Sequence, residues 1–592
     1  MSSSTVIHDS SDPLGQQKGL QQFKHVERVE KPSNEDLTYE NDEEPELHAQ
    51  TYIALAAMFL LNLVQVFALL GPPSGLSYIE KDLNDTLNGT WVPNSLSLVQ
   101  AVLAPLISSA SDTFQARKVL LVVPAIISFI GCAIAPGSGS IYRLIAAQVL
   151  IGFGFATVPL AYCIPSEIIP RKWRPMAQAF MNIAAALGAC AGPLIIGSLT
   201  KKNPHTGWRY FYWIQMALWG MTAVCLFVGY RPPKRHTRLD HLSFYEKLGR
   251  LDIPGMFLLT AGLTLLLTGL NLGGGLYPWA SATVLATLII GILALIAFGI
   301  YEWRFTTTGI LHHDLFKGPN HGGRTFGICI GLIFIEGVLL FAFVIFYPVL
   351  TKTLFETDPF LNAARQQPYW IASALSTLVY GYASVKFRTI RFPMIAGFVI
   401  LTGGIVGLTT IQPGNDFNAL AFAALTGLGF GAPLILIIAG VQLSVPHHLI
   451  ATATAATTCS RAVAAAVFTA IASAAMNSRL EKYIPTYTAK AALEAGLPKS
   501  SLVGFIKALT SEDTAALQKV AGVSSHIIEA GVMALKQAYA DGVRIVFIIA
   551  APFGVVAILA CIFLGDLKSV MNYGVDAPVE NLQAKHSRQD NV

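Results

Sequence analysis

The chain is poor in charged residues. Asp, Glu, Lys and Arg make up 13% of its 592 residues, against about 25% in typical soluble domains, while apolar residues make up 53% and the mean hydropathy is +0.54. This composition excludes a disordered chain, a nucleic-acid-binding protein with a basic face and an ordinary soluble enzyme. It indicates an all-α, polytopic membrane protein.

Cysteine and the motifs of metal or nucleotide binding are also scarce. The chain has seven cysteines, all inside apolar runs, so a disulfide framework is not expected. No CxxC pair occurs, and the adjacent pairs His312-His313 and His447-His448 do not face the same way on a helix, so we expect no metal site. No GxxxxGKS/T motif occurs either. We therefore expect no cofactor, no nucleotide and no enzymatic activity.

Long apolar runs are abundant instead. A helix that crosses ~30 Å of hydrocarbon needs about 20 apolar residues. The runs of suitable length are 51–70, 94–110, 119–136, 141–162, 176–199, 210–230, 253–272, 281–302, 326–349, 367–384, 392–410, 419–443, 450–476 and 543–565. The sequence therefore predicts 14 transmembrane helices.

The polar stretches divide the chain into two six-helix halves with an inserted helix pair. The expected parts are a disordered acidic cytoplasmic tail 1–50, an N-terminal half 51–230, a cytoplasmic linker 231–252, the inserted pair 253–303, a cytoplasmic loop 304–325, a C-terminal half 326–565 that includes an extracellular loop 477–541, and a cytoplasmic tail 566–592. Within the extracellular loop, the Ala-rich stretches 489–496 and 527–540 predict short amphipathic helices.

Lys and Arg are unevenly distributed over the short loops. With the N-terminus inside, the inner loops hold 17 of these residues and the outer loops hold 7. Basic residues are enriched in cytoplasmic loops, so this distribution favours an orientation with both ends inside. Two sequons, at Asn84 and Asn88, then lie outside, where glycosylation can reach them.

Similar sequences recur eight spans apart. Gly-rich runs in the fourth and twelfth spans precede Pro170 and Pro446 by similar distances, and segment 108–118 is similar to segment 381–391. The spacing predicts a parallel repeat of six spans with two spans inserted between the copies. Transporters use such repeats and bind their substrates near the midplane, between the halves.

The fifth span is rich in small residues, which let helices approach closely in lipid, and it contains a proline that bends it. This stretch resembles the antiporter motif of the major facilitator superfamily. Its motif residues are Gly188, Gly192, Pro193 and Gly197.

Two charged inner segments carry the same resemblance. One is similar to the superfamily's loop between spans two and three, although Ser108 and Gln115 replace glycines that are usual there. The other resembles the charged segment after span four. The charged residues of the two segments are Asp112, Arg117, Lys118, Glu167 and Arg174.

Residues 252–279, in the inserted pair, are similar to those of 14-span fungal drug and toxin exporters. Together with the long loop before the last span, they make residues 51–575 resemble the trichothecene efflux pump family. The resemblance implies a secondary active transporter that exports an amphipathic small organic compound (a toxin, drug or secondary metabolite) by proton antiport with alternating access. Two alternatives stay open: import of a ferric siderophore, as in a related 14-span family, and a membrane sensor that does not transport.

Several positions that usually carry charge in the superfamily are neutral in this chain. Gln148 stands where drug exporters often have Arg in span four, and span one offers only Asn62 and Gln65 in place of an acid. These three residues are candidate proton or substrate ligands, and proton coupling itself is implied only by the resemblance.

Two charged residues remain away from the ends of the spans. Glu336 is near the centre of the ninth span, and Arg461 is in the thirteenth. Ionisable residues at this depth are costly and mark functional sites. We expect Glu336 to bind a proton or substrate, or else to make a structural hydrogen bond, and Arg461 to support packing between the halves. The candidates for an apolar site wall are Phe343, Phe346, Tyr347, Tyr380 and Phe430.

The expected partners are therefore a small amphipathic organic substrate, protons and the lipid bilayer, with no nucleic acid. The plasma membrane is the expected location, with the vacuolar membrane as the alternative.

Overall fold

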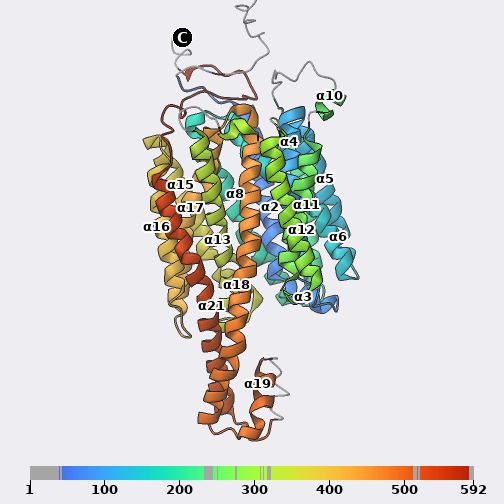
Figure 1. The fold of residues 1–592 in the computed structure, drawn as a ribbon, viewed down its shortest axis with the longest axis vertical. Coiled ribbons are helices and arrows are strands. Elements are labelled where there is room, and N and C mark those ends of the chain that lie inside the picture. The colour runs from blue at the N-terminus through green and yellow to red at the C-terminus, as the bar shows by residue number, and fades with distance from the viewer. Residues whose placement is uncertain are drawn as a thin grey trace, which may run out of the picture.

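The computed structural model describes residues 39, 43–232, 244–249, 251–273, 277–306, 309–310, 312–316, 322–510, 517 and 520–585. Parts of the predicted tails, of the linker 231–252 and of the loop 304–325 lie outside these ranges. Within them all regular structure is helical, and the only β-type pairings are three isolated bridges. The long helices stand side by side in one bundle (Figure 1).

The first half contains six spans, of which the fourth consists of two helices in sequence. Its spanning helices are α2 (Ala49–Ser74), α4 (Trp91–Phe114), α5 (Arg117–Ile134), α6 (Ile141–Phe155) with α7 (Val158–Ile168), α8 (Arg174–Lys202) and α9 (Gly207–Gly229). The short helix α3 (Leu76–Asp82) follows α2 at one end of the bundle.

The inserted pair is α11 (Ile253–Leu272) and α12 (Ala282–Arg304), preceded by α10 (Phe244–Gly249). The two long helices pack on each other, and Asn94 of α4 donates a hydrogen bond to Asn271 of α11 over 3.0 Å. Most apolar side chains of α12 are exposed on the outside of the bundle, which is the arrangement expected for contact with lipid.

The second half repeats the plan of the first. Its helices are α13 (Gly322–Leu354), the short α14 (Pro359–Arg365), α15 (Gln367–Phe387), α16 (Arg391–Leu408), α17 (Asp416–Ser444), α18 (Ile450–Glu494) and α21 (Ser525–Ile562), with α19 (Leu502–Thr510) between the last two.

Every predicted span is helical. Thirteen described segments, with α6 and α7 counted together, have the length and hydropathy needed to cross a membrane. The remaining predicted span, 367–384, is α15, whose 21 residues are also long enough. Several buried polar residues, including Ser373 and Thr377, lie within this helix and lower its hydropathy.

The bundle has two apolar cores. One is built almost wholly from α2 to α9, and the other from α13 to α21. A division into two halves therefore exists in the packing as well as in the sequence repeat.

Helices α18 and α21 are much longer than a bilayer requires, with 45 and 38 residues. They extend together beyond the other helices at one end of the bundle (Figure 1). The expectation of separate short helices at 489–496 and 527–540 is wrong: most of the first stretch belongs to α18 and all of the second to α21. Alanine-rich sequence has the highest helix propensity, so both spans continue as helix into the loop.

The described residues nearest the two termini lie on the opposite face of the bundle from this extension, and we call this the termini face (Figure 1). Residues 39 and 43–50 are the described part of the predicted tail 1–50, and they pair there with the segment after α21. Tyr39 pairs with Val575, and Pro45 pairs with Ala584, as isolated antiparallel bridges. Residues on both sides of these bridges exchange hydrogen bonds, which explains why polar sequence is ordered here without an apolar run.

The predicted repeat has matching backbone turns. Gln115 after α4 and Arg388 after α15 both adopt left-handed backbone, with φ of 55° and 49°. Pro170 and Pro446 are each followed by one 3₁₀ turn and then by a long helix. By these matches, α4 of the first copy is equivalent to α15 of the second, and α8 is equivalent to α18.

Candidate functional site

Glu336 and Arg461 form an ion pair inside the second half. The Arg461 Nε donates to the Glu336 Oε2 over 2.8 Å, and the Glu336 side chain is fully buried. Gly337 lets the helices approach at this point, because a Cβ there would lie 3.2 Å from the Arg461 carbonyl oxygen. Arg461, expected only to support packing, thus pairs directly with the candidate acid Glu336. The sequence alone did not predict this pairing.

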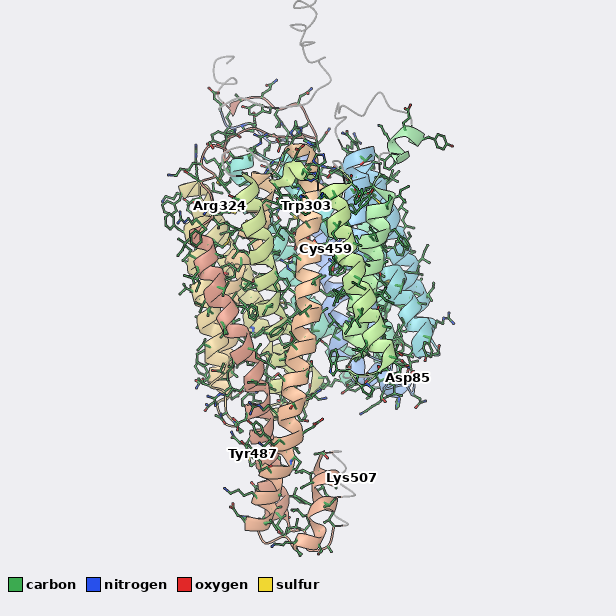
Figure 2. The ribbon with its side chains drawn as sticks, in the orientation of Figure 1. Asp85, Trp303, Arg324, Cys459, Tyr487 and Lys507 are labelled. Carbon is green, nitrogen blue, oxygen red and sulfur yellow. The ribbon has the colours of Figure 1, made fainter. Side chains whose placement is uncertain are left out.

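The depth of the pair follows from helix geometry. Glu336 is 14 residues from the start of α13, and Arg461 is 11 residues from the start of α18, or roughly 21 and 17 Å along helices that begin at the termini face. Figure 2 shows Cys459, two residues before Arg461, between the two ends of the bundle. Both charges therefore lie well inside the length of helices that are long and apolar enough to cross a membrane.

Aromatic rings line α13, α15 and α17 beside the pair. Phe343 stacks on Tyr347 with ring centroids 4.6 Å apart and on Tyr369 with centroids 4.0 Å apart. Tyr369 in turn lies 5.4 Å from Phe430. Tyr369 thus joins three of the aromatics predicted for the site wall, whereas no ring contact connects Phe346 or Tyr380 to them among the described residues. Sequence analysis missed Tyr369 because it lies outside the Gly-rich and charged motifs.

The helix that carries Arg461 also packs against the first half. Helix α18 contacts both α4 and α7. Two residues before Arg461, the Cys459 thiol donates to the Ala101 carbonyl of α4 over 3.5 Å. The charged site of the second half therefore borders the first half.

The candidate ligands of the first half are uncharged amide side chains in its interior. Gln148 donates to the Tyr212 hydroxyl over 2.9 Å, and Asn62 donates to the Met58 carbonyl over 2.9 Å. Asn62 and Gln148 are both buried. These predicted ligands thus take local partners on their own side and are not joined to Glu336.

A break in the fourth span was not anticipated from the sequence. The predicted helix 141–162 is interrupted at Ala156 and Thr157, which form a turn between α6 and α7. Gln65 donates to the Gly154 carbonyl and to the Thr157 hydroxyl, each over 3.0 Å. Irregular backbone inside a membrane must find such partners, and in transporters it marks the substrate region.

Buried polar atoms without a hydrogen bond among the described residues occur on both sides of the boundary. In the second half they include Glu336 Oε1, Arg461 Nη2, Tyr369 Oη and Ser373 Oγ. In the first half they include Gln65 Oε1, Gln148 Oε1, Asn182 Nδ2 and both amide atoms of Gln215. Unpaired buried polar groups are costly, so these atoms are available to a ligand or to water.

The charged motif residues gather on the termini face. Arg117 lies between two acids: it is 3.3 Å from Asp112 and in contact with Glu167. Lys118 takes no part in this group and lies over the Phe227 ring, 4.8 Å from its centroid.

Arg174 bridges the halves on the same face. Its guanidinium donates to the Ser166 carbonyl over 2.9 Å and to the Gln442 carbonyl of α17 over 2.6 Å, and it also contacts Asp576. Asp576 is in the predicted free tail 566–592, so sequence gave no signal for this contact.

The glycine motif of α8 serves two different contacts. At Gly188 a Cβ would overlap the Leu63 carbonyl of α2, and at Gly192 it would lie 3.0 Å from the Phe67 carbonyl. At Gly197 it would lie 3.2 Å from the backbone of Phe360 in α14, in the other half. Beside that contact, Lys201 of α8 pairs with Asp358 over 2.5 Å. The halves therefore touch on both faces of the bundle.

Comparison with known proteins agrees with this architecture. The family model described as the fungal trichothecene efflux pump matches residues 31–590. The chain is 24% identical to a trichothecene efflux pump of Trichoderma arundinaceum over 88% of this chain and 89% of that protein. It is 27% identical to the MFS-type transporter ucsD of an Acremonium species over 64% of this chain.

The match spans 63% of the length of the Acremonium transporter and 60% of that of a Schizosaccharomyces pombe transporter. Among solved structures, a bacterial homologue of the lysosomal transporter Spinster has a TM-score of 0.50 at 16% identity, and covers 88% of this chain and 99% of its own. The proton:xylose symporter XylE has a TM-score of 0.50 at 13% identity with the same coverage. At these identities the solved structures establish the fold alone.

Proposed function

The chain belongs to the fungal trichothecene efflux pump family, whose members are transporters and not enzymes, and on that premise we propose that it exports an amphipathic small organic compound by proton antiport. The compound is a toxin, drug or secondary metabolite. The observation that carries the proposal is the buried pair of Glu336 and Arg461 beside the boundary between the halves.

The pair suits exchange of a proton for a substrate. When Glu336 is ionised, it holds the Arg461 guanidinium through one oxygen, and its other oxygen has no hydrogen bond in the described structure. While the carboxylate is ionised, a substrate hydroxyl can donate to this second oxygen, and protonation removes the negative charge that makes it a strong acceptor, so the substrate is released. A proton and a substrate would then alternate at one site, as antiport requires.

Alternating access would use the boundary between the halves. The termini face is held by polar contacts such as Arg174 with Gln442, and the opposite face is held by Lys201 with Asp358. Breaking one set while keeping the other would expose the midplane to one side at a time. The aromatic rings around Tyr369 supply an apolar wall for the carbon skeleton of the substrate.

The charge distribution over the loops supports a cytoplasmic termini face. The plasma membrane is the proposed location, because export from the cell requires it.

The first step of the test is to identify a transported compound. Cells with and without the chain are compared for retained organic compounds, and a compound retained only in its absence becomes the assay substrate. In proteoliposomes with an imposed proton gradient, Glu336→Gln should abolish concentrative export while exchange without a gradient survives. Glu302→Gln is the matched control, since Glu302 is a buried acid of α12 whose carboxylate accepts from the Ile310 amide, away from the site.

Loss of both activities in Glu336→Gln would assign Glu336 to substrate binding. Normal export by this variant between pH 5 and 7 would contradict the proposal. Siderophore-dependent growth without export would favour the importer instead.

A further inference from the structure

The segment after α21 crosses from one half of the protein to the other. Leu564, Leu567 and Met571 are buried in the core of the second half. Val579, eight residues after Met571, is buried in the core of the first half. We call residues 564–580 the strap.

The strap is bound to the loop between α7 and α8 through its backbone. The Lys172 amide donates to the Asn572 carbonyl over 2.8 Å, and the Arg171 amide donates to the Gly574 carbonyl over 3.0 Å. In the other direction, the Ala577 amide donates to the Glu167 carbonyl over 2.9 Å. Three backbone hydrogen bonds, two to this loop and one to the last turn of α7, are typical of recognition of an extended peptide.

Asp576 supplies a charged anchor in the middle of this segment. Its carboxylate accepts from the Arg171 Nε over 3.0 Å and contacts the Arg174 guanidinium, and its side chain is only 5% exposed. Burial alone would raise the pKa of Asp576, but the positive charges of Arg174 and Arg171 lower it below its ordinary value. Beside it, the Lys172 ammonium donates to the Tyr573 hydroxyl over 2.8 Å.

The end of the strap reaches the first span. The Glu580 carboxylate accepts from the His48 amide over 2.7 Å and from the Thr51 hydroxyl over 2.5 Å, at the start of α2. The strap thus contacts α2, α7 and α8 of the first half while it remains covalently joined to α21 of the second.

We propose that the basic loop Arg171–Arg174 is a binding site for an extended, carboxylate-bearing peptide, and that the strap is its built-in ligand, which holds the two halves together on the termini face. Movement of the halves apart on this face requires one end of the strap to detach. The end in the first half detaches, because most of its contacts are hydrogen bonds that exchange for hydrogen bonds to water and only Val579 leaves an apolar core there, whereas the end in the second half would have to expose Leu564, Leu567 and Met571.

The test uses cysteine accessibility of the purified full-length chain, which does not depend on transport. Ala577 is 2% exposed, whereas Ser569 is exposed and lies earlier in the strap. We expect Ala577→Cys to react with a water-soluble maleimide at least about tenfold more slowly than Ser569→Cys. Adding Asp576→Asn should remove most of this protection, whereas adding Asp566→Asn should not, because Asp566 bonds only the Lys568 amide nearby. The unaltered chain measures the background of its seven native cysteines.

Equal reactivity at the two positions in the otherwise unaltered chain would overturn the proposal. Protection that persists with Asp576→Asn would show that this carboxylate is not the anchor. If Asp576→Asn does not fold, Arg171→Gln tests the same contact from the other side, with the same expected rise in reactivity.

A crosslink tests detachment itself. Lys172→Cys together with Asn572→Cys replaces neighbours whose backbones are joined by a 2.8 Å hydrogen bond. Oxidation should stop export of the assay compound, and reduction should restore it. Full export by the crosslinked protein would overturn the need for detachment, while absence of export by the unaltered chain would count against the proposed function and leave the accessibility result standing.

Discussion

Asp112 at the end of α4 caps the first turn of α18, although the two helices belong to different halves. Its Oδ2 accepts from the Thr452 amide over 3.0 Å and from the Thr452 hydroxyl over 2.8 Å. A carboxylate at this place satisfies an unpaired helix amide and interacts favourably with the helix dipole. Because Asp112 also pairs with Arg117, one side chain links the charged group of the first half to the second.

Removal of the Asp112 carboxylate should therefore loosen the termini face. Asp112→Ala loses the cap and the pairing with Arg117, and we expect export to fall about tenfold or more, since a cap alone contributes about 1 kcal/mol. Thr452→Val removes only the hydroxyl and should be milder. The measurement is the export rate of each variant, compared at equal amounts of protein in the membrane. Equal loss of export in both variants would contradict this role of the carboxylate.

The interaction energy between Glu336 and Arg461 can be measured from the stabilities of single and double variants. Each of Glu336→Gln and Arg461→Gln leaves the other charge buried without its partner, which costs about 3–5 kcal/mol. The double variant removes both charges and should be less destabilised than the sum of the single variants by about 1–3 kcal/mol. Thermal unfolding of the purified proteins gives the three values. Strict additivity would mean that the two residues act independently.

The glycines of α8 should differ in their tolerance of a side chain. Gly188→Ala should be more harmful than Gly192→Ala, because a Cβ at Gly188 overlaps backbone of α2, whereas at Gly192 it lies 3.0 Å away. Gly192→Leu should abolish export while much of the protein still reaches the membrane. Gly327→Ala is the control, since no atom lies within 4 Å of a Cβ there. Wild-type export by Gly192→Leu would reduce the motif to a coincidence.

Glycosylation tests the orientation of the bundle. Asn84 is exposed with φ of 52° on the face opposite the termini, whereas the Asn88 amide donates to Asp85 over 3.0 Å and to Tyr142 over 3.2 Å. We expect Asn84 to carry the larger share of any glycan, and Asn84→Gln with Asn88→Gln to remove it entirely. Gel mobility before and after glycosidase treatment is the measurement, and tags at both ends should stay cytoplasmic. Detection of the N-terminal tag outside the cell would contradict the predicted orientation.

The strap should be insensitive to pH over the physiological range. The pKa of Asp576 is lower in the folded protein than its ordinary value near 3.9, so its contribution is fully present above that ordinary value and is lost as the pH falls through the lower, folded value. The positive charges that lower this pKa belong to Arg174, Arg171 and His447. Reactivity of Ala577→Cys, corrected for thiolate fraction, should stay constant from pH 5 to 8. Loss of protection near pH 6 would identify another titrating group.

The sequence by itself determined the number and position of the spans, because in lipid an apolar run of about 20 residues must satisfy its backbone as helix. It also determined the repeat and marked Glu336 and Arg461 as the charged residues away from the ends of the spans. Hydropathy and spacing are local properties, so these conclusions needed no knowledge of packing.

Only the tertiary structure decided which polar groups meet. Glu336 and Arg461 are 125 residues apart in sequence, and their pairing depends on the rotation and close approach of α13 and α18 at Gly337. The turn at Ala156 and the partners of Asp576 depend likewise on side chains from distant segments. A lone acid in a polar tail carries no local signal, and its role arises only when two arginines of another helix end surround it.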